Sequence, residues 1–201
     1  MKRATLEQLR QPLEEGSIMI SRIEGRYHYP AKFLLVAAMN PCPCGYYPDR
    51  NRCNCAQYEV NRYLNHVSQP LLDRIDLAVE ITSLSFEEFR KKAEDSEWTS
   101  VEMAKKVAKV HKMQKIRYKD ENFQFNSEIP TEKILKYCSI SEKAEDLLQK
   151  TFSRMGLTGR SCNKILKVAR TIADLEESER ITEQHLAEAI GFRGIDKNYW
   201  K

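Results

Sequence analysis

The chain has 201 residues, of which 41% are hydrophobic and 31% charged, and its formal net charge is +4 at pH 7. This is the composition of a soluble globular protein with apolar residues for one ordinary domain or two small ones, and the charge is too small to imply nucleic-acid binding by itself. No apolar run approaches the ~20 residues that cross a bilayer, and Met1-Lys-Arg leads into a charged helix, so no membrane partner and a cytoplasmic location are expected.

The first thirty residues predict a helix followed by a hairpin. Thr5-Leu-Glu-Gln8 matches a capping box with Thr5 as the N-cap, and Gly16 is expected to end that helix. Residues 17–22 and 26–29 are extended in pattern and are separated by the turn signal Glu24-Gly25. We therefore predict a β-hairpin over this segment.

An apolar run over residues 33–39 leads into a loop rich in cysteine. The run has strand length and is continuous, which is typical of a strand covered on both faces. Directly after it come two C-x-C pairs separated by eight residues; the four cysteines are Cys42, Cys44, Cys53 and Cys55.

The four cysteines indicate a structural zinc site. Four thiolates satisfy the tetrahedral preference of Zn²⁺ and leave no open position for water, so the role would be structural. A reducing cytoplasm and the strain of a disulfide between residues two apart argue against two local disulfides. C-x-C is less diagnostic than C-x-x-C, and a loop with four reduced thiols is the alternative. Cys138 and Cys162 stand singly in helical patterns and are interpreted as core residues.

The rest of the chain predicts one more strand and then helices. A short helix near residues 58–67 and a strand over 71–81 complete an α/β pattern. A long basic helix is predicted over 99–119, and the polar stretch 120–128 is interpreted as a linker. Helices are predicted over 141–155 and 159–175, followed by a last helix capped by Thr182.

This organisation predicts an α/β plus all-α chain in three parts. Residues 1–83 form the α/β part with the tetracysteine loop, residues 84–126 the basic helix and linker, and residues 127–201 the helical bundle.

Three segments resemble a known family. They are residues 33–45, Leu-Leu-Asp-Arg-Ile-Asp over residues 71–76, and residues 164–175. In this order they resemble the magnesium-chelatase-like AAA+ ATPases and, within these, the competence-related ComM/YifB group. The opening residues 6–21 are similar to the segment that follows the second nucleotide motif of that family. The resemblance implies the C-terminal half of a AAA+ α/β core followed by a helical lid.

The chain departs from the family pattern in its nucleotide motifs. It contains no G-x-x-x-x-G-K-[ST] phosphate loop, and no apolar strand ends in Asp-Glu to hold Mg²⁺. Ala173-Asp-Leu-Glu-Glu177 is instead the end of a helical pattern. The chain therefore resembles the part that follows the magnesium-binding motif, and we expect it not to hydrolyse ATP alone. ATP and Mg²⁺ would belong to the intact protein, with a missing N-terminal ATPase half as partner.

The resemblance assigns roles to three side chains. Asn40 occupies a position similar to sensor 1, which orients the attacking water or contacts the γ-phosphate. Arg74 resembles an arginine finger offered to the ATP of a neighbouring subunit, and Arg160 resembles sensor 2, which links nucleotide state to lid position. The alternatives are an Asn-Pro turn, an arginine paired with Asp73 or Asp76, and a solvated first-turn arginine.

The predicted hairpin corresponds in the family to an insertion that can face a central pore. Arg22, Arg26 and Tyr27 suit phosphate contact and base stacking on DNA, and a solvated hairpin tip is the alternative. The basic helix over 99–119 could track a nucleic-acid backbone, but a lysine-rich solvated face is the usual explanation.

The resemblance implies a part of a ring-forming ATPase. The ring, expected to be a hexamer of subunits of the same protein, would couple ATP hydrolysis to DNA remodelling, with helicase-like branch migration during natural transformation. The alternative is a standalone zinc-containing nucleic-acid-binding module without ATPase activity, whose DNA affinity would fall steeply with salt and ignore nucleotide.

Overall fold

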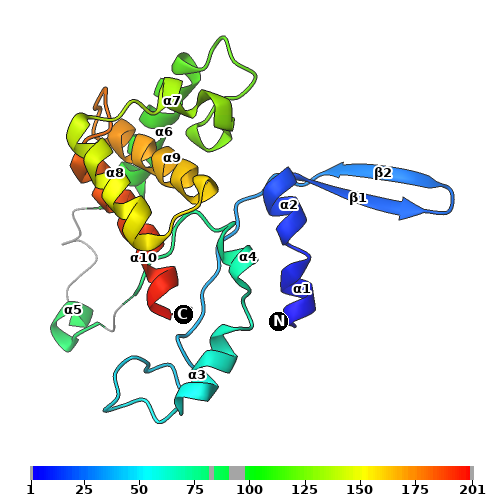
Figure 1. The fold of residues 1–201 in the computed structure, drawn as a ribbon, viewed down its shortest axis with the longest axis vertical. Coiled ribbons are helices and arrows are strands. Elements are labelled where there is room, and N and C mark those ends of the chain that lie inside the picture. Colours follow the sequence, from blue (N-terminus) through cyan, green and yellow to red (C-terminus); the bar gives the residue numbers. More distant parts are fainter. Residues whose placement is uncertain (1, 82–83, 91–97, 200–201) are drawn as a thin grey trace. The chain divides into compact units, whose positions relative to one another are not determined.

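The computed structural model describes the backbone of residues 2–81, 84–90 and 98–199. The chain divides into two compact units, residues 1–75 with 195–201 and residues 76–194. Within these residues, Figure 1 shows helices and the antiparallel ribbon of β1 and β2. In chain order the elements are α1 (Arg3–Glu7), α2 (Arg10–Glu15), β1 (Ser17–Arg22), β2 (Gly25–Pro30), α3 (Gln57–Leu64), α4 (Gln69–Leu72), α5 (Phe86–Arg90), α6 (Ser100–Arg117), η2 (Asn126–Glu128), η3 (Thr131–Lys133), α7 (Ile134–Tyr137), α8 (Glu142–Met155), α9 (Gly159–Leu175) and α10 (Glu183–Tyr199).

The first unit begins with two short helices in place of one. The prediction of Thr5 as N-cap is wrong, because α1 already begins at Arg3. Gly16 ends α2 in the left-handed conformation, with φ of 63°, as predicted. The hairpin is confirmed: β1 and β2 pair antiparallel, with Ser17 opposite Pro30 and Arg22 opposite Gly25.

The two apolar segments predicted as strands do not form strands here. Residues 31–40 have neither helix nor strand, and α4 covers the start of the second segment, whose remainder to residue 81 is also irregular. A strand is held by main-chain hydrogen bonds to a neighbouring strand, and β1 and β2 bond to each other. The apolar side chains stay in solvent, with Leu34 88% and Val36 82% exposed.

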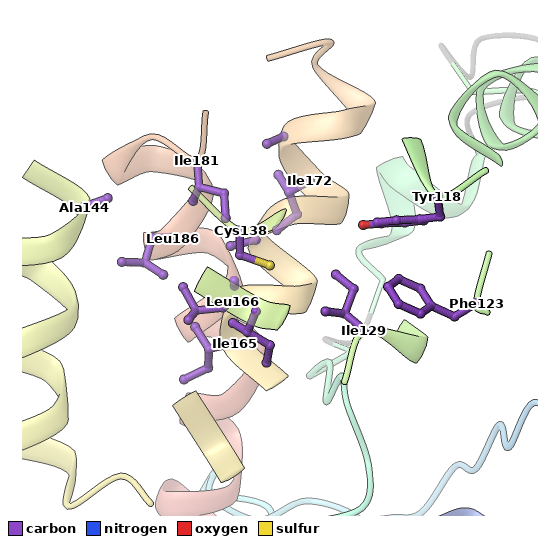
Figure 2. Packing of buried hydrophobic residues seen from close by; sticks show 14 residues of the cluster. Tyr118, Phe123, Ile129, Cys138, Ala144, Ile165, Leu166, Ile172, Ile181 and Leu186 are labelled. Atoms are coloured by element: carbon purple, nitrogen blue, oxygen red, sulfur yellow. The ribbon is translucent and has the colours of Figure 1, made fainter. Parts of the chain in front are cut away.

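The second unit is built around α9. One face of that helix is buried and includes Ile165, Ala169 and Ile172, as the helical spacing predicts. Ile181 and Leu186 close the same cluster from the segment before α10 and from α10 itself, as Figure 2 shows. Cys138 is buried in this cluster, which confirms its interpretation as a core residue.

The sequence predicted that residues 120–128 form a linker, and this prediction is wrong. Phe123 and Asn126 are buried, and the ring of Phe123 lies 4.8 Å from that of Tyr118, centroid to centroid. Figure 2 shows these two rings together beside Ile129. The polar composition misleads because Asn126 is buried as a hydrogen-bonding residue.

The helix starts predicted in the second unit are confirmed by their caps. The hydroxyl of Ser141 accepts from the amide of Ala144, and that of Thr182 accepts from the amide of His185. Thr99 and Glu102 form a capping box at the start of α6. Among the helices within the described ranges, none has the length and apolarity needed to cross a bilayer.

Candidate functional site

The tetracysteine loop folds as two tight turns over α3. The amide of Gly45 donates to the carbonyl of Cys42 at 3.1 Å, and the amide of Cys53 donates to that of Asp49 at 2.8 Å. These turns bring the two C-x-C pairs to the same point. Cys42 and Cys53 are buried and pack with Val60 and Leu64 of α3. The short helix predicted after the loop, α3, therefore supplies the apolar side chains on which the two buried cysteines pack.

The four sulfurs have the separations of a tetrahedral metal site. Cys42 Sγ lies 3.3 Å from Cys44 Sγ and 3.8 Å from Cys53 Sγ, and Cys44 Sγ lies 3.6 Å from Cys53 Sγ. All four Sγ atoms lie within 4.8 Å of one another. Sulfurs bound at ~2.3 Å to one tetrahedral Zn²⁺ are ~3.8 Å apart, whereas a disulfide needs ~2 Å. The cluster therefore fits a closed four-sulfur metal centre, and all four thiols are free.

The thiols influence one another's protonation. The backbone amide of Tyr46 and the Cys42 thiol lower the pKa of Cys44 to about 6. The backbone amide of Cys44 favours the thiolate of Cys55, but burial and the neighbouring sulfurs outweigh it and raise the pKa of Cys55 to about 12. Burial acts against the Cys42 thiolate, but the backbone amide of Tyr47 helps to lower the pKa of Cys42, whereas burial raises the pKa of Cys53. The surroundings thus favour two of the four thiolates and oppose the other two. A bound dication would remove this conflict, because it favours every thiolate in its shell.

Asn40 lies where the apolar segment meets the cysteine loop. It is exposed, and a Cβ placed on Gly45 would lie 3.7 Å from its side-chain Nδ2. Gly45 has a φ of +85°, so glycine suits both the conformation and the close approach. The first turn of the cysteine loop therefore sets the surroundings of the Asn40 amide.

Arg74 is held by α2 and α4. Its Nε donates to the carbonyl of Arg10 at 3.0 Å and its Nη1 to the carbonyl of Pro70 at 2.6 Å, while Nη2 pairs with the carboxylate of Glu14. The alternative drawn from the sequence was that Arg74 pairs with Asp73 or Asp76. In the structure the carboxylate paired with Arg74 is that of Glu14, and Asp76 pairs with Lys164 instead. The Arg74 side chain is 14% exposed and that of Glu14 35%, so this pair lies at the surface of its unit.

The remaining predicted residues lie on other elements. Arg160 is exposed in the first turn of α9, next to the N-cap Thr158, in the second unit. On the hairpin, the register places Tyr27 opposite Ile20 and Arg26 opposite Ser21. Because alternate residues share a face, Tyr27 and Arg22 lie on one face of the ribbon and Arg26 on the other.

Two residues near these sites were missed by sequence reasoning. Glu14 holds Arg74 from sixty residues away, and no local pattern marks such a pair. Tyr29, opposite Ile18, shares a hairpin face with Tyr27. The alternation of Tyr27 and Tyr29 in the sequence was the signal that could have found the second residue.

Comparison with known proteins gives the same family over both halves of the chain. Residues 1–89 match the model for magnesium chelatase, subunit ChlI, and residues 97–193 match the model for the ChlI C-terminal region. Competence protein ComM of Haemophilus influenzae is 40% identical over 96% of the chain. The uncharacterized proteins YifB of Salmonella typhimurium and Rv2897c of Mycobacterium tuberculosis are 39% and 36% identical over 98% and 94%. The chain spans 37% to 38% of the length of these relatives.

Proposed function

Since this chain belongs to the magnesium chelatase-like family, with the two family models together spanning nearly all of it, we propose that it is the C-terminal part of a ring-forming ATPase. Asn40 and Arg74 of the first unit and Arg160 of the second would act there as sensor 1, arginine finger and sensor 2. The division into a part of the AAA+ core over residues 1–83 and a lid over 127–201, with the basic helix α6 between them in sequence, belongs to the same proposal.

The state of Arg74 is the observation on which this proposal relies most. The guanidinium is positioned by two carbonyls and neutralised by one partly exposed carboxylate, Glu14. Three glutamates, Glu7, Glu14 and Glu15, line the hollow beside it. A phosphate group could therefore reach Arg74 only by replacing Glu14, and it would bind the same planar fork of donors. Arg74 would then stabilise charge on the ATP of a neighbouring subunit.

We infer that magnesium nucleotide binds outside the described residues of this chain. Within the described ranges, the cysteines form the one group of three or more His, Cys, Asp or Glu side chains that could share an ion. No phosphate loop occurs in the sequence. ATP and Mg²⁺ would be bound by the N-terminal half of the intact protein, which is the first partner of this chain, and we expect negligible ATPase from the chain alone.

We assign the tetracysteine loop a structural Zn²⁺ held by Cys42, Cys44, Cys53 and Cys55. The sulfur separations and the mutual pKa shifts support this assignment. With four protein ligands the ion would offer no open position for water or substrate. Its contribution would be to fix the turn beside Asn40.

The hairpin would contact DNA in the central pore. Arg22 and Tyr27 share an exposed face, so phosphate pairing and base stacking could occur together. The name of the Haemophilus relative, a competence protein, supports branch migration of DNA during natural transformation as the activity.

The hairpin contact is tested in the full-length protein. Tyr27→Ala should weaken single-stranded DNA binding by roughly 1–3 kcal/mol, because the base that stacks on the ring loses its partner. Equal affinity for wild type and variant would contradict this contact.

The arginine finger is tested in the full-length protein. Arg74→Ala should lower ATP turnover by ~10³-fold or more, with ATP binding unchanged, because the lost charge acts on the neighbour's transition state. Arg62→Ala, an exposed arginine on α3, is the matched control and should turn over normally. Mixing Arg74→Ala subunits with subunits defective in the phosphate loop should restore part of the activity. Unchanged turnover in Arg74→Ala would remove the assignment.

The standalone binding module is the other outcome. DNA affinity that ignores nucleotide and subunit neighbours, together with normal turnover in Arg74→Ala, would favour it over the ring ATPase.

A further inference from the structure

Positive charge is concentrated in and around α6. Residues 100–120 contain seven lysines or arginines and two acidic residues, a formal charge of +5. The whole chain carries +4, so the other residues together are close to neutral. A local excess of this size on one helix attracts polyanions even though the net charge of the chain does not.

The lysines do not cover α6 evenly. Val110 and Gln114 are buried and Met113 and Arg117 are half-buried, which defines the side of the helix that packs on its unit. At 100° per residue, Lys105, Lys112 and Lys115 fall on the opposite side, and all three are exposed. We call these three lysines the outer lysine face of α6.

The three lysines of this face lack the partners that occupy their neighbours. Lys109 pairs with Glu177, Arg117 pairs with the buried Asp174, and Lys106 lies 3.9 Å from the ring centre of Trp98. No such contact involves Lys105, Lys112 or Lys115 anywhere in the part of the chain that is described. Their ammonium groups therefore remain available to an external anion.

The helix that carries this face is firmly fixed at its C-terminal half. Gln114 Nε2 donates to Asp174 Oδ2 at 3.1 Å, and Arg117 Nη1 donates to the same oxygen at 2.8 Å. Tyr118 Oη donates to Asn126 Oδ1 at 2.6 Å. These buried contacts join α6 to α9 and η2, so the lysines project from a rigid rod rather than from a mobile segment.

We propose that the outer lysine face of α6 binds the phosphate backbone of duplex DNA. From Lys105 to Lys115 the helix axis rises ~15 Å, and a duplex presents about nine phosphate charges over the same length. The described residues place no aromatic side chain on this face that could stack on unpaired bases, which favours a duplex over a single strand. Because lysine is a point charge, the contact carries no sequence preference.

A lipid surface suits this face less well. An amphipathic helix binds a membrane through an apolar stripe that points to the lipid. Met103 and Val107 of α6 are exposed, but at 100° per residue they lie on the same side as the buried Val110, away from the three lysines. The inference goes beyond the proposed function, because it requires neither ATP nor the hairpin nor a ring.

The test measures binding of this chain to a short labelled duplex, without nucleotide, at several salt concentrations. Three phosphate contacts should contribute about −2.7 to the slope of log affinity against log salt, or a ~40-fold loss between ~50 and ~200 mM. Lys105→Gln, Lys112→Gln and Lys115→Gln combined should remove this contribution. The triple variant should remain folded, because all three side chains are exposed. Its circular dichroism melting curve, compared with that of the wild type, checks this.

The matched control changes the same charge on another helix. Lys143→Gln, Lys150→Gln and Arg154→Gln lie on α8, are exposed, and should leave the salt slope at the wild-type value. Equal losses in both triple variants, or none in the α6 variant, would overturn the proposal. So would an α6 variant that loses binding to vesicles containing anionic lipid but keeps its duplex affinity. Failure of the proposed ATPase function would leave all of these results unchanged, because no nucleotide is present.

Discussion

Asp174 is the residue on which the second unit converges. Its carboxylate is fully buried and accepts hydrogen bonds from α6, from η2 and from its own helix; the donors are Gln114, Arg117, Asn126 and Arg170. Arg170 is buried as well and donates to the carbonyls of Ser178 and Glu179. A carboxylate in this position is structural, which confirms that residues 173–177 end a helix and are not a magnesium motif.

Asp174→Asn should strongly destabilise the second unit. The change leaves the buried charge of Arg170 without its carboxylate, and breaking a buried ion pair in this way costs about 3–5 kcal/mol. Chemical denaturation followed by circular dichroism measures the difference. Asp146→Asn on the exposed face of α8 is the control and should change the unfolding free energy by less than about 0.5 kcal/mol. A loss for Asp174→Asn no larger than in this control would contradict the role of the network.

The same carboxylate makes stability depend on acid. Burial alone would raise the pKa of Asp174, but hydrogen bonds from Arg117 and Asn126 and the charge of Arg170 lower it. A lowered folded-state pKa contributes stability above the ordinary aspartate value of ~3.9, and the contribution is lost as pH falls below that value. Wild-type unfolding free energy should therefore fall more steeply than that of Asp174→Asn over this acidic range.

At the scale of elements, the tetracysteine loop has few apolar contacts of its own. Its core consists of Cys42 and Cys53 against Val60 and Leu64, with three half-buried neighbours. So few apolar residues stabilise a loop of this length weakly, and small sites of this kind usually take their folding free energy from the metal.

Purified chain should contain one zinc per molecule by inductively coupled plasma mass spectrometry. Cys53→Ser should abolish binding, because one of four ligands is lost from a closed site. Cys162→Ser, on α9 and outside the cluster, is the matched control and should keep the full metal content. A strong chelator should lower the melting temperature of the wild type and leave that of Cys53→Ser unchanged. Metal-free wild-type protein with four titratable thiols would refute the site.

The hairpin shows how register refines a prediction made from composition. Sequence reasoning grouped Arg22, Arg26 and Tyr27 as one DNA-contacting set. The pairing of β1 with β2 divides that set, because Arg26 lies on the face opposite Tyr27. Tyr29 lies on the Tyr27 face instead. A base-stacking surface on this ribbon would therefore use the two tyrosines with Arg22.

At the scale of the whole molecule, two exposed apolar segments distinguish this chain from a closed domain. Residues 33–39 and 77–81 have the composition of buried strands but lie in solvent; Ile81, for instance, is 90% exposed. An apolar run of this length is stable in water only when neighbouring strands take up its main-chain hydrogen bonds and helices cover its faces. The relatives are more than twice as long, so a longer protein could supply those neighbours.

The segment 33–39 should become a strand in a longer protein of the relatives' length. Hydrogen exchange at these amides should be fast in this chain and slowed by at least ~100-fold in the longer protein, because new main-chain partners would protect them. The amides of Ile165 and Ala169 in the middle of α9 are the internal control and should be protected in both. Fast exchange of residues 33–39 in both proteins would exclude a strand there.

Local signals determined much of this protein. The hairpin, the helices α8 and α9, and the caps Ser141 of α8 and Thr182 of α10 follow from turn residues, capping hydroxyls and helical periodicity. The tetracysteine cluster also followed from spacing, because eight residues are enough for two turns to bring two C-x-C pairs together. The family followed from ordered motifs along nearly the whole chain.

Contacts between residues far apart in sequence were decided only by the tertiary structure. The pairing of Arg74 with Glu14, the burial of Asn126 against Asp174, and the exposure of residues 33–39 each depend on which distant group is present or missing. A strand in particular is defined by its neighbours, so its pattern predicts it only when those neighbours belong to the same chain. Periodicity and capping act within a few residues, whereas pair partners and sheet edges are set by the folded chain as a whole.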